Sequence, residues 1–559
     1  MLMQVEGCAT CGGRRRCFKA AWQTSHFSYF GVKEWGVRSK FCLHDVCSVV
    51  VSSRQQISMR REWRRSAVRF RIAASFGASA DQCIPGVEKE RRKILMSHTV
   101  NMSLLRARLA KSVGLVAACA AFSGAGAGAD VVLDWNNVLL DTIRGYGDPG
   151  QSTGNIQAAR AAAMMHTAVH DAVSGIDALN KPLWYSPYHV ATSPGNANAS
   201  REAAVAGAAH SVLTTMYPGF QVNFDAALNN TLAGLGGGQN VNDGLAWGQF
   251  VGNEILNARA SDGTNSPQQY TPGTGPGNWV MPGADWGTSH WAHSNPWAMS
   301  SADQFLAPGP RALDSAEYAA AWQEVYDYGS VNSAVRTADQ TEAVAYWQNG
   351  AGTHRPPGIW NVIAQSAINL SGTPGGVVGD SLSENARLFA HLNIALMDAG
   401  ISSWNSKHEF NFWRPITAIH EADTDGNGAT ASDAAWVPLV DAVGSPEYTS
   451  GLSTFSMAAA MILTEYFGEN YNFSSMSDGT SSNPDILRSF GSFAEAAFEA
   501  GDSRIWAGIH FRFSNEDGFD VGEGIADLVF NNYLLAIPTP GAGLAFVIGL
   551  AATGARRRR

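Results

Sequence analysis

The feature that most constrains the fold is a long succession of helix-forming segments after residue 130. Residues 158–176 (AARAAAMMHTAVHDAVSGI) consist mainly of strong helix formers, and residues 131–146 are amphipathic. Strand signals are weak throughout. The sequence therefore predicts an all-α fold built as a helical bundle. Similar patterns predict further helices at 199–216, 220–234, 242–260, 315–329, 336–350, 357–370 and 381–404.

One long segment without helix signals interrupts this succession. Residues 261–312, here called the lid segment, are rich in Gly, Pro and Trp. A loop of that length inside a compact domain is usually functional, and this one is too apolar to be a linker. We therefore expect it to form a lid or to wrap over the helices.

The first 129 residues differ from the rest of the chain. Residues 1–101 show no sustained periodicity and hold 18 Lys and Arg against 7 Asp and Glu. Residues 102–129 combine three cations, an apolar run and small residues, which is the pattern of a secretory signal peptide. Because such a peptide stands at a true N-terminus, we expect 1–101 to be an over-extension of the gene model or a disordered leader. The protein is then exported, and its main domain spans 130–535.

Charge and cysteine content exclude several classes of function for the main domain. Residues 130–555 hold 14 Lys and Arg against 41 Asp and Glu, a net charge of −27. A surface of that sign offers no basic footprint, so nucleic acid is not expected as a partner. All seven cysteines precede residue 130, which excludes a disulfide framework, a thiolate nucleophile and a cysteine metal site from the main domain.

The last residues, 536–559, combine Pro-x-Pro, a short apolar run and four terminal arginines. This pattern resembles the PEP-CTERM sorting signal of bacterial exported proteins. The resemblance implies processing by an exosortase-type enzyme and delivery to the cell envelope or the extracellular matrix. A simple tail anchor is the alternative, although the apolar run is short for an independent membrane span.

A lysine and an arginine stand close together in an aromatic stretch, WNSKHEFNFWRP at 404–415. Lys407 and Arg414 are seven residues apart, so a helix that continues to Arg414, where Pro415 ends it, places both on one face. Two fixed cations on an apolar wall suit an oxyanion with several oxygens, such as phosphate or vanadate. The alternative is a pair of surface cations with buried stems. Lys407 is one of only two lysines in 130–555, which favours a functional role.

Two further motifs follow along the chain. Ser450 and Gly451 stand just before an apolar helix predicted at 456–467. Backbone N–H groups at a helix start bind anions, and glycine lets a ligand approach closely. Arg504 then supplies a third cation, and His510 follows six residues later.

These motifs occur in the order Lys-x6-Arg-Pro, Ser-Gly and Ser-Arg-x3-Gly-x-His. Their order resembles the vanadium-dependent haloperoxidase and type 2 phosphatidic acid phosphatase superfamily. The neighbouring residues, STFS at 453–456 and GIHFRF at 508–513, are most similar to its bacterial chloroperoxidase-like branch. The resemblance covers about residues 130–535 and implies an all-α fold of four-helix bundles with long loops.

The resemblance also implies roles for the residues of the three motifs. Vanadate would be the cofactor, with phosphate as a competing oxyanion. His510 would be the apical group, which coordinates vanadium in a peroxidase or attacks phosphorus in a phosphatase. The oxyanion would be held by the charges of Lys407, Arg414 and Arg504 and by hydrogen bonds from Ser450 and the Gly451 N–H group.

Two positions depart from the family pattern. The second motif normally reads Ser-Gly-His, and that histidine is the general acid–base, whereas this chain has Leu452. The position four residues after His510, commonly Asp in this branch, is Ser514. The anion site is therefore expected to be intact while proton transfer is impaired. His408, next to Lys407, is a geometrical substitute, although a packed or solvent-facing role is commoner for such a histidine.

Three functions remain open on the sequence alone. The first is an exported haloperoxidase-like enzyme that uses vanadate and hydrogen peroxide to oxidise a halide, with activity impaired by Leu452. The second is a phosphatase that hydrolyses a phosphate ester at the same site. The third is a surface protein that binds an oxyanion without turnover, which the leucine favours.

Two other patterns resemble metal sites but have simpler explanations. His166 and His170 are four residues apart on a predicted helix, yet packed helix histidines are commoner than ligands. Residues 423–428 (DTDGNG) imitate the start of a calcium loop, but the twelfth position is Ala434 rather than glutamate, so an ordinary Asp/Gly turn is expected.

Overall fold

The computed structural model describes residues 3–5, 20–22, 130–146, 148–267, 270–280, 286, 288–371, 381–441, 443–479 and 485–538. The chain divides into two compact units, Met1–Ser123 and Gly124–Arg559. In the first unit, the described residues form the antiparallel strands β1 (Met3–Val5) and β2 (Ala20–Trp22). The predicted signal peptide at 102–129, nearly all of 1–101 and the tail after residue 538 lie outside the described residues.

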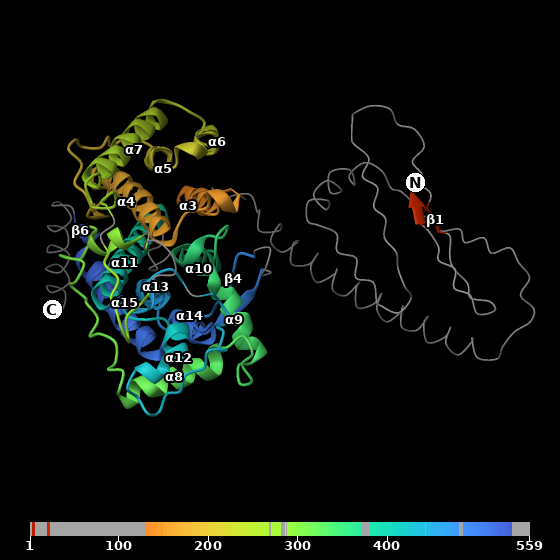
Figure 1. Ribbon diagram of the computed structural model, residues 1–559. Coiled ribbons are helices and arrows are strands. Elements are labelled where there is room, and N and C mark those ends of the chain that lie inside the picture. Colours follow the sequence, from red (N-terminus) through yellow and green to blue (C-terminus); the bar gives the residue numbers. More distant parts are fainter. Residues whose placement is uncertain are drawn as a thin grey trace, which may run out of the picture. The chain divides into compact units, whose positions relative to one another are not determined.

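The second unit is helical, which confirms the predicted all-α fold class (Figure 1). Most predicted helices agree with the observed ones to within a few residues. Its helices are α3 (Val131–Ile143), α4 (Asn155–Asn180), α5 (Arg201–Met216), α6 (Gln221–Gly234), α7 (Gln239–Ala258), α8 (Ala316–Gly329), α9 (Ala338–Gln348), α10 (Arg355–Ser371), α11 (Ser381–Phe410), α12 (Pro415–His420), α13 (Gly451–Phe467), α14 (Phe493–Trp506) and α15 (Arg512–Asn532).

The alanine-rich and glycine-rich sequences of α4, α5 and α7 explain how closely these helices pack. A Cβ atom at Gly244 would lie 2.2 Å from the Ser200 carbonyl oxygen, and one at Gly248 would lie 2.0 Å from that of Ala204. Only glycine allows backbones to approach so closely. The α5–α7 pair packs against α4 and lies at one end of the unit, with α8 and α12 at the opposite end (Figure 1).

Helix α11 is the central element and leads directly to the predicted oxyanion site. It packs against α4, α13 and α15, and nearly all of its residues from Leu382 to Ser403 are buried. Helix α13 in turn packs against α14 and α15. These four helices, α11, α13, α14 and α15, therefore bring the ends that carry the three sequence motifs into one bundle.

The lid segment wraps over α11, as predicted. Among its described residues it contains one short 3-10 helix, η3 (Ser289–His293), which contacts α11. Asp398 of α11 accepts hydrogen bonds from the backbone N–H groups of Trp297, Ala298 and Met299, at 2.7, 2.7 and 2.9 Å. Three such bonds to a buried carboxylate anchor the segment on the bundle.

The described residues of the second unit also form two short antiparallel ribbons. Strand β3 (Leu183–Tyr185) pairs with β6 (Ala536–Pro538), so the end of the described domain is joined to the loop after α4. Strand β4 (Phe473–Met476) pairs with β5 (Leu487–Phe490). Within the described parts of the chain, no helix is long and apolar enough to cross a membrane.

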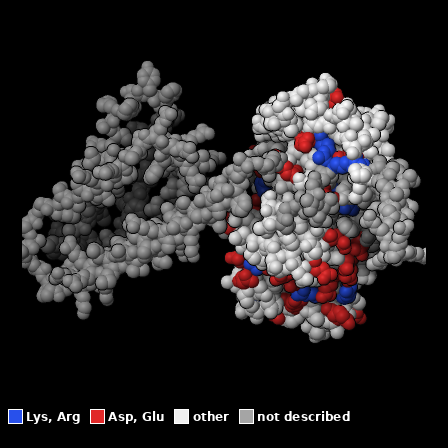
Figure 2. All heavy atoms as spheres, turned by 180° about the vertical axis from the view of Figure 1, so that it is seen from behind, with Lys and Arg blue, Asp and Glu red and all other residues white. Residues whose placement is uncertain are grey.

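The surface carries the acidic excess expected from composition. On the face seen in Figure 2, acidic side chains clearly outnumber basic ones. Two arginines of the described chain are paired with acids: Arg488 contacts Asp339 and Glu499, and Arg512 contacts Glu324. This face offers no basic footprint for a polyanion.

Candidate oxyanion site

The turn after α11 corrects one prediction about Arg414. Helix α11 ends at Phe410, and Asn411 adopts the left-handed region with φ of 45°, which asparagine tolerates better than most residues. Arg414 is extended and caps the separate helix α12, with Pro415 in its first position. The prediction that one helix continues to Arg414 is therefore wrong, because the chain reverses before the proline.

Lys407 and Arg414 nevertheless reach the same place. The Lys407 Nζ atom donates to the carbonyl oxygens of Pro446 and Glu447, at 3.0 and 2.8 Å. Arg414 Nη2 donates to the same Pro446 carbonyl at 3.1 Å. Both side chains are only 2% exposed. Burial and the neighbouring Arg414 lower the pKa of Lys407 well below its usual value, against the opposing effect of Glu447.

Arg414 is a structural hub of this region. Burial lowers its pKa to about 10. Its five N–H groups are all engaged, so the guanidinium is held in one orientation. The acceptors are the Ser445 carbonyl (2.9 Å), the Ser445 hydroxyl (3.0 Å), the Pro446 carbonyl (3.1 Å), the Ile509 carbonyl (2.9 Å) and His510 Nε2 (3.2 Å).

His510 lies between α14 and α15 and is held from both ring nitrogens. Its Nδ1 atom lies 2.7 Å from Glu447 Oε1, while Nε2 faces Arg414 Nη1. Because arginine can only donate, Nε2 must carry the lone pair and Nδ1 the proton. Burial, followed by the charges of Arg414, Lys407 and Arg504, depresses the pKa of His510 far below its ordinary value. The imidazole is therefore neutral, with its lone pair on Nε2.

Glu447 is the functional residue that the sequence analysis missed. It is fully buried, and its Oε1 atom also accepts from the Phe511 N–H group at 3.0 Å. Burial raises its pKa to about 7, although Arg414 and Lys407 oppose the rise. Ser514, at the position expected to be Asp, lies 3.5 Å from His510 Nδ1, too far for a strong bond. Glu447 thus supplies the carboxylate that residue 514 lacks.

The Ser-Gly motif starts α13, five residues earlier than predicted. Ser450 is its N-cap and accepts a hydrogen bond from the Ser453 N–H group at 3.4 Å. A Cβ atom at Gly451 would lie 3.3 Å from the Trp404 ring, so glycine suits this position. Leu452 is buried in the first turn of α13 and offers no group that titrates.

Arg504 lies in the last turn of α14 and is the least satisfied cation of the set. Its Nε atom donates to the Ser503 hydroxyl at 3.0 Å, but its Nη2 atom is buried without a partner. Burial lowers its pKa to about 10. Gly508, with φ of +79°, then turns the chain toward His510. The structure thus places a buried, incompletely bonded guanidinium close enough to His510 to shift its pKa.

The charges of these residues do not balance. In the described region, three buried basic side chains, Lys407, Arg414 and Arg504, lie around His510, and a single carboxylate, Glu447, acts on the charges of Lys407 and Arg414. Excess buried positive charge is costly unless an anion accompanies it. The predicted residues therefore form a connected, electropositive cluster. Arg504 and Ser450 make no direct hydrogen bond to the other members of the cluster. They are connected to it through residues that lie near His510 in the sequence.

The remaining candidate residues have structural roles. His408 faces the lid segment, where its Nε2 atom lies 3.4 Å from that of His293, so it does not replace the histidine absent at 452. His166 and His170 are buried and bonded to Asn136 and the Ser186 carbonyl, which confirms the packing interpretation. The 423–428 stretch is a turn closed by its own side chains.

No cluster of three or more potential metal-ligating side chains occurs among the described residues.

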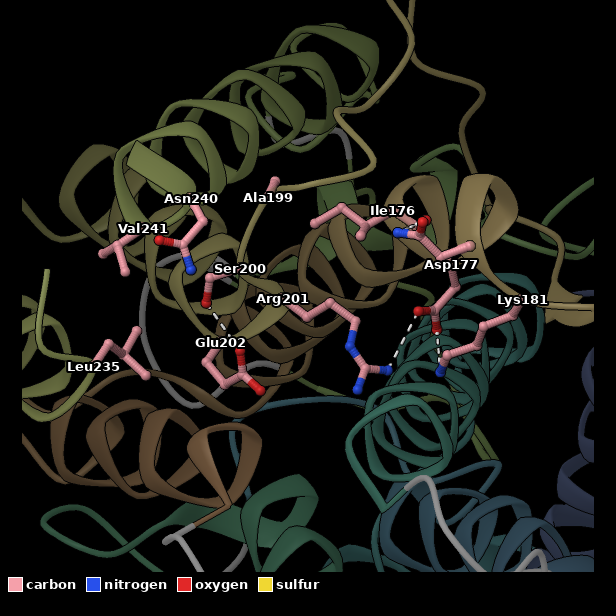
Figure 3. A pocket seen from close by; sticks show the side chains of 11 residues that line it. Ile176, Asp177, Lys181, Ala199, Ser200, Arg201, Glu202, Leu235, Asn240 and Val241 are labelled. Carbon is pink, nitrogen blue, oxygen red and sulfur yellow. Dashed lines mark hydrogen bonds and ion pairs between the residues drawn. The ribbon is translucent and has the colours of Figure 1, made fainter. Parts of the chain in front are cut away.

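A pocket of about 610 Å³ lies elsewhere, between the end of α4 and the starts of α5 and α7 (Figure 3). Two acidic side chains, Asp177 and Glu202, balance its two cations, and Asp177 accepts from Lys181 and Arg201 at 3.0 and 3.3 Å. This pocket therefore lacks the charge excess of the cluster around His510.

Comparison with known proteins agrees with the observed fold. Residues 387–537, which contain all six predicted site residues, match the family model of the VCPO second helical-bundle domain. Vanadium chloroperoxidase from Curvularia inaequalis is 26% identical over 491 residues, which cover 70% of this chain and 80% of that protein.

A solved structure, described as the first bacterial vanadium-dependent iodoperoxidase, is also similar. It aligns with a TM-score of 0.58 and 24% identity, covering 73% of this chain and 95% of that one. The chain therefore has the helical fold of that structure, and its residues 387–537 match the family model of the VCPO second helical-bundle domain.

Proposed function

We propose that the cluster around His510 binds vanadate and that the protein is a haloperoxidase-type enzyme, which oxidises a halide with hydrogen peroxide. One observation carries the proposal: three buried cations surround a neutral histidine and are opposed by a single carboxylate. A bound oxyanion would supply the missing negative charge. The similarity to vanadium chloroperoxidase favours vanadate over other oxyanions.

The residues present fit such an anion. Arg504 Nη2 is a buried donor without a partner, and it would donate to an oxygen of the anion. Gly451 opens α13, where N–H groups have no intrahelical acceptor, and its lack of a side chain lets an oxygen approach. Lys407 and Arg414 would add charge while their present bonds to backbone carbonyls keep them in place.

His510 would bind the anion through Nε2. Glu447 holds the proton on Nδ1, which leaves the lone pair on Nε2, and the hydrogen bond that Nε2 now accepts from Arg414 Nη1 would give way to the anion. A carboxylate behind a ligating histidine fixes the tautomer and raises ligand basicity. When bound, vanadate supplies the Lewis-acidic centre at which hydrogen peroxide oxidises the halide.

Leu452 is expected to limit the rate of this enzyme. A side chain that moves protons contributes about a hundred- to ten-thousand-fold to a rate, and leucine contributes none. His408 faces the lid segment instead of the cluster. We therefore expect oxyanion affinity typical of an intact cluster together with slow turnover.

A phosphatase is the second candidate, because the same Nε2 lone pair suits nucleophilic attack on phosphorus. Phosphate would then occupy the vanadate position, and a phosphate ester would be the substrate. A surface protein that binds an oxyanion without turnover is the third candidate, and Leu452 favours it. These three functions use the same charge cluster. They differ in the reaction that follows oxyanion binding: halide oxidation, phosphate-ester hydrolysis or none.

Export also belongs to the proposal. The signal-peptide pattern at 102–129 and the PEP-CTERM-like pattern at 536–559 support secretion, exosortase-type processing and an envelope or extracellular location. Strand β6 ends at Pro538, so removal of the residues beyond it would leave the β3–β6 ribbon intact.

Two assays separate the candidate functions. The purified chain should be tested for halide oxidation with hydrogen peroxide and added vanadate, and for phosphate-ester hydrolysis without vanadate. Halide oxidation that depends on vanadate and is lost in His510→Ala supports the haloperoxidase. Phosphate-ester hydrolysis supports the phosphatase, and vanadate binding without either activity supports the non-catalytic protein. Absence of any vanadate or phosphate binding refutes all three.

A further inference from the structure

Two histidines from distant parts of the sequence face each other where the lid segment meets α11. His293 is the last residue of η3 and is exposed, while His408 lies in the last turn of α11. Their Nε2 atoms are 3.4 Å apart, and the rings are nearly perpendicular, with centroids 4.5 Å apart. The pair plays no part in the oxyanion cluster, although His408 follows Lys407 directly.

The separation of the two nitrogens suits a shared cation better than a direct hydrogen bond. N–H donors usually lie about 2.9–3.0 Å from their acceptors, so 3.4 Å leaves a weak bond. Two imidazoles that bind zinc tetrahedrally at about 2.0–2.1 Å place their nitrogens about 3.3–3.4 Å apart. A small rotation of the exposed His293 ring would turn both lone pairs toward one point.

Neighbouring contacts hold the backbones of the two histidines at this distance. Asn405 Nδ2 donates to the Ala292 carbonyl at 3.2 Å, and Trp404 Nε1 donates to the Thr288 hydroxyl at 3.1 Å. These bonds join η3 to α11 through Ala292, next to His293, and through residues of the helical turn before His408. A metal ion would therefore meet two ligands that are already positioned rather than ordering them itself.

The chemistry of the pair indicates the class of metal. Imidazole nitrogen suits zinc, copper and nickel rather than magnesium or calcium, which prefer oxygen. Burial, followed by the charge of His408, lowers the pKa of His293. The acidic excess of the domain, −27 over 130–555, also concentrates cations near its surface.

We propose that His293 and His408 form a two-histidine site for a divalent transition-metal ion such as Zn²⁺, with solvent completing the coordination. The ion joins the lid segment to α11 one residue from Lys407. This site is separate from the proposed vanadate site and does not depend on it.

Isothermal titration of the full chain with Zn²⁺, after chelator treatment and without an affinity tag or vanadate, tests the proposal. One ion should bind per chain, and Co²⁺ in its place should give the intense visible absorption of tetrahedral coordination. Loss of a partner outside the ligand set already costs about 10–100-fold in metal affinity. His293→Gln and His408→Gln, each of which removes a ligand, should therefore weaken binding at least tenfold.

His420→Gln is the matched control, because His420 Nε2 is bonded to the Trp436 carbonyl at 2.8 Å and takes no part in the pair. It should bind Zn²⁺ like the wild type. Amide hydrogen exchange around Ala292 should slow on addition of Zn²⁺ in the wild type and in His420→Gln, but not in the two ligand variants. Failure of the wild type to bind stoichiometrically, or wild-type affinity in both ligand variants, overturns the proposal.

Discussion

Replacing Arg504 by methionine tests whether the cluster is built for an anion. Burial lowers the pKa of this arginine from its ordinary value to about 10 on folding. A lowered pKa means that the charged form is disfavoured in the folded state. The cost is complete below pH 10 and disappears as the pH rises to the ordinary pKa of arginine. Since each pKa unit is worth about 1.4 kcal/mol, the cost at neutral pH is about 3 kcal/mol.

Arg504→Met removes this cost and fills a similar volume. It also removes the hydrogen bond from Nε to Ser503, which contributes about 1 kcal/mol. The ligand-free variant should therefore be at least as stable as the wild type, with a gain of up to about 2 kcal/mol. Few buried arginines would behave in this way, because most are satisfied by their partners.

The same substitution should weaken vanadate binding. A ligand at a hundred times its Kd stabilises a protein by about 2.7 kcal/mol. Loss of a hydrogen bond to a charged group costs about 1.5–3 kcal/mol, which is at least a tenfold rise in Kd. At the same vanadate concentration, the stabilisation of Arg504→Met should then be about 1.4 kcal/mol or less.

Thermal and urea unfolding with and without vanadate measure both effects. Arg259→Met is the matched control, because this buried arginine donates to the Pro296 carbonyl at 2.9 Å and stacks on Trp297. It should destabilise the ligand-free protein and leave the vanadate increment unchanged. The reasoning fails if Arg504→Met destabilises the ligand-free protein as much as Arg259→Met does and vanadate still stabilises it as much as the wild type. That result would mean that the charge of Arg504 is satisfied without an anion.

Four further predictions follow from the same cluster and from the tail. Leu452→His should raise peroxidase or phosphatase turnover with little change in vanadate affinity, and Leu452→Ala should change neither; unchanged turnover in Leu452→His would show that another residue moves the proton. His510→Ala should abolish vanadate stabilisation in unfolding experiments. Burial raises the pKa of Glu447 from 4.5 to about 7 in the folded state, so the free energy of unfolding should decrease as the pH rises from about 4.5 to 7. Glu447→Gln, which cannot titrate, should show a smaller decrease when unfolding is measured across this pH range. Deletion of 539–559 should mislocalise the protein in fractionated cells but leave its melting temperature unchanged.

The fold class and most of the site residues could be predicted from local sequence. Helix propensity and 3.6-residue periodicity act over a few turns, so helices such as α4 were evident without tertiary information. Lys407, Arg414 and His510 were found because their spacing matches a family pattern, and because lysine is so rare in the domain. Helix ends were less predictable. Asn411 adopts a left-handed conformation that ends α11 before Arg414, and asparagine permits this conformation without requiring it.

Other features arise only from contacts between distant segments. Glu447 orients His510 across 63 residues of sequence, and His293 meets His408 across 115. No local pattern reports such a meeting, because long-range contacts depend on how helices pack and not on their own periodicity. The same holds for charge: lysine and arginine can be counted in a sequence, whereas the unpartnered guanidinium of Arg504 results from burial, which the tertiary structure alone determines.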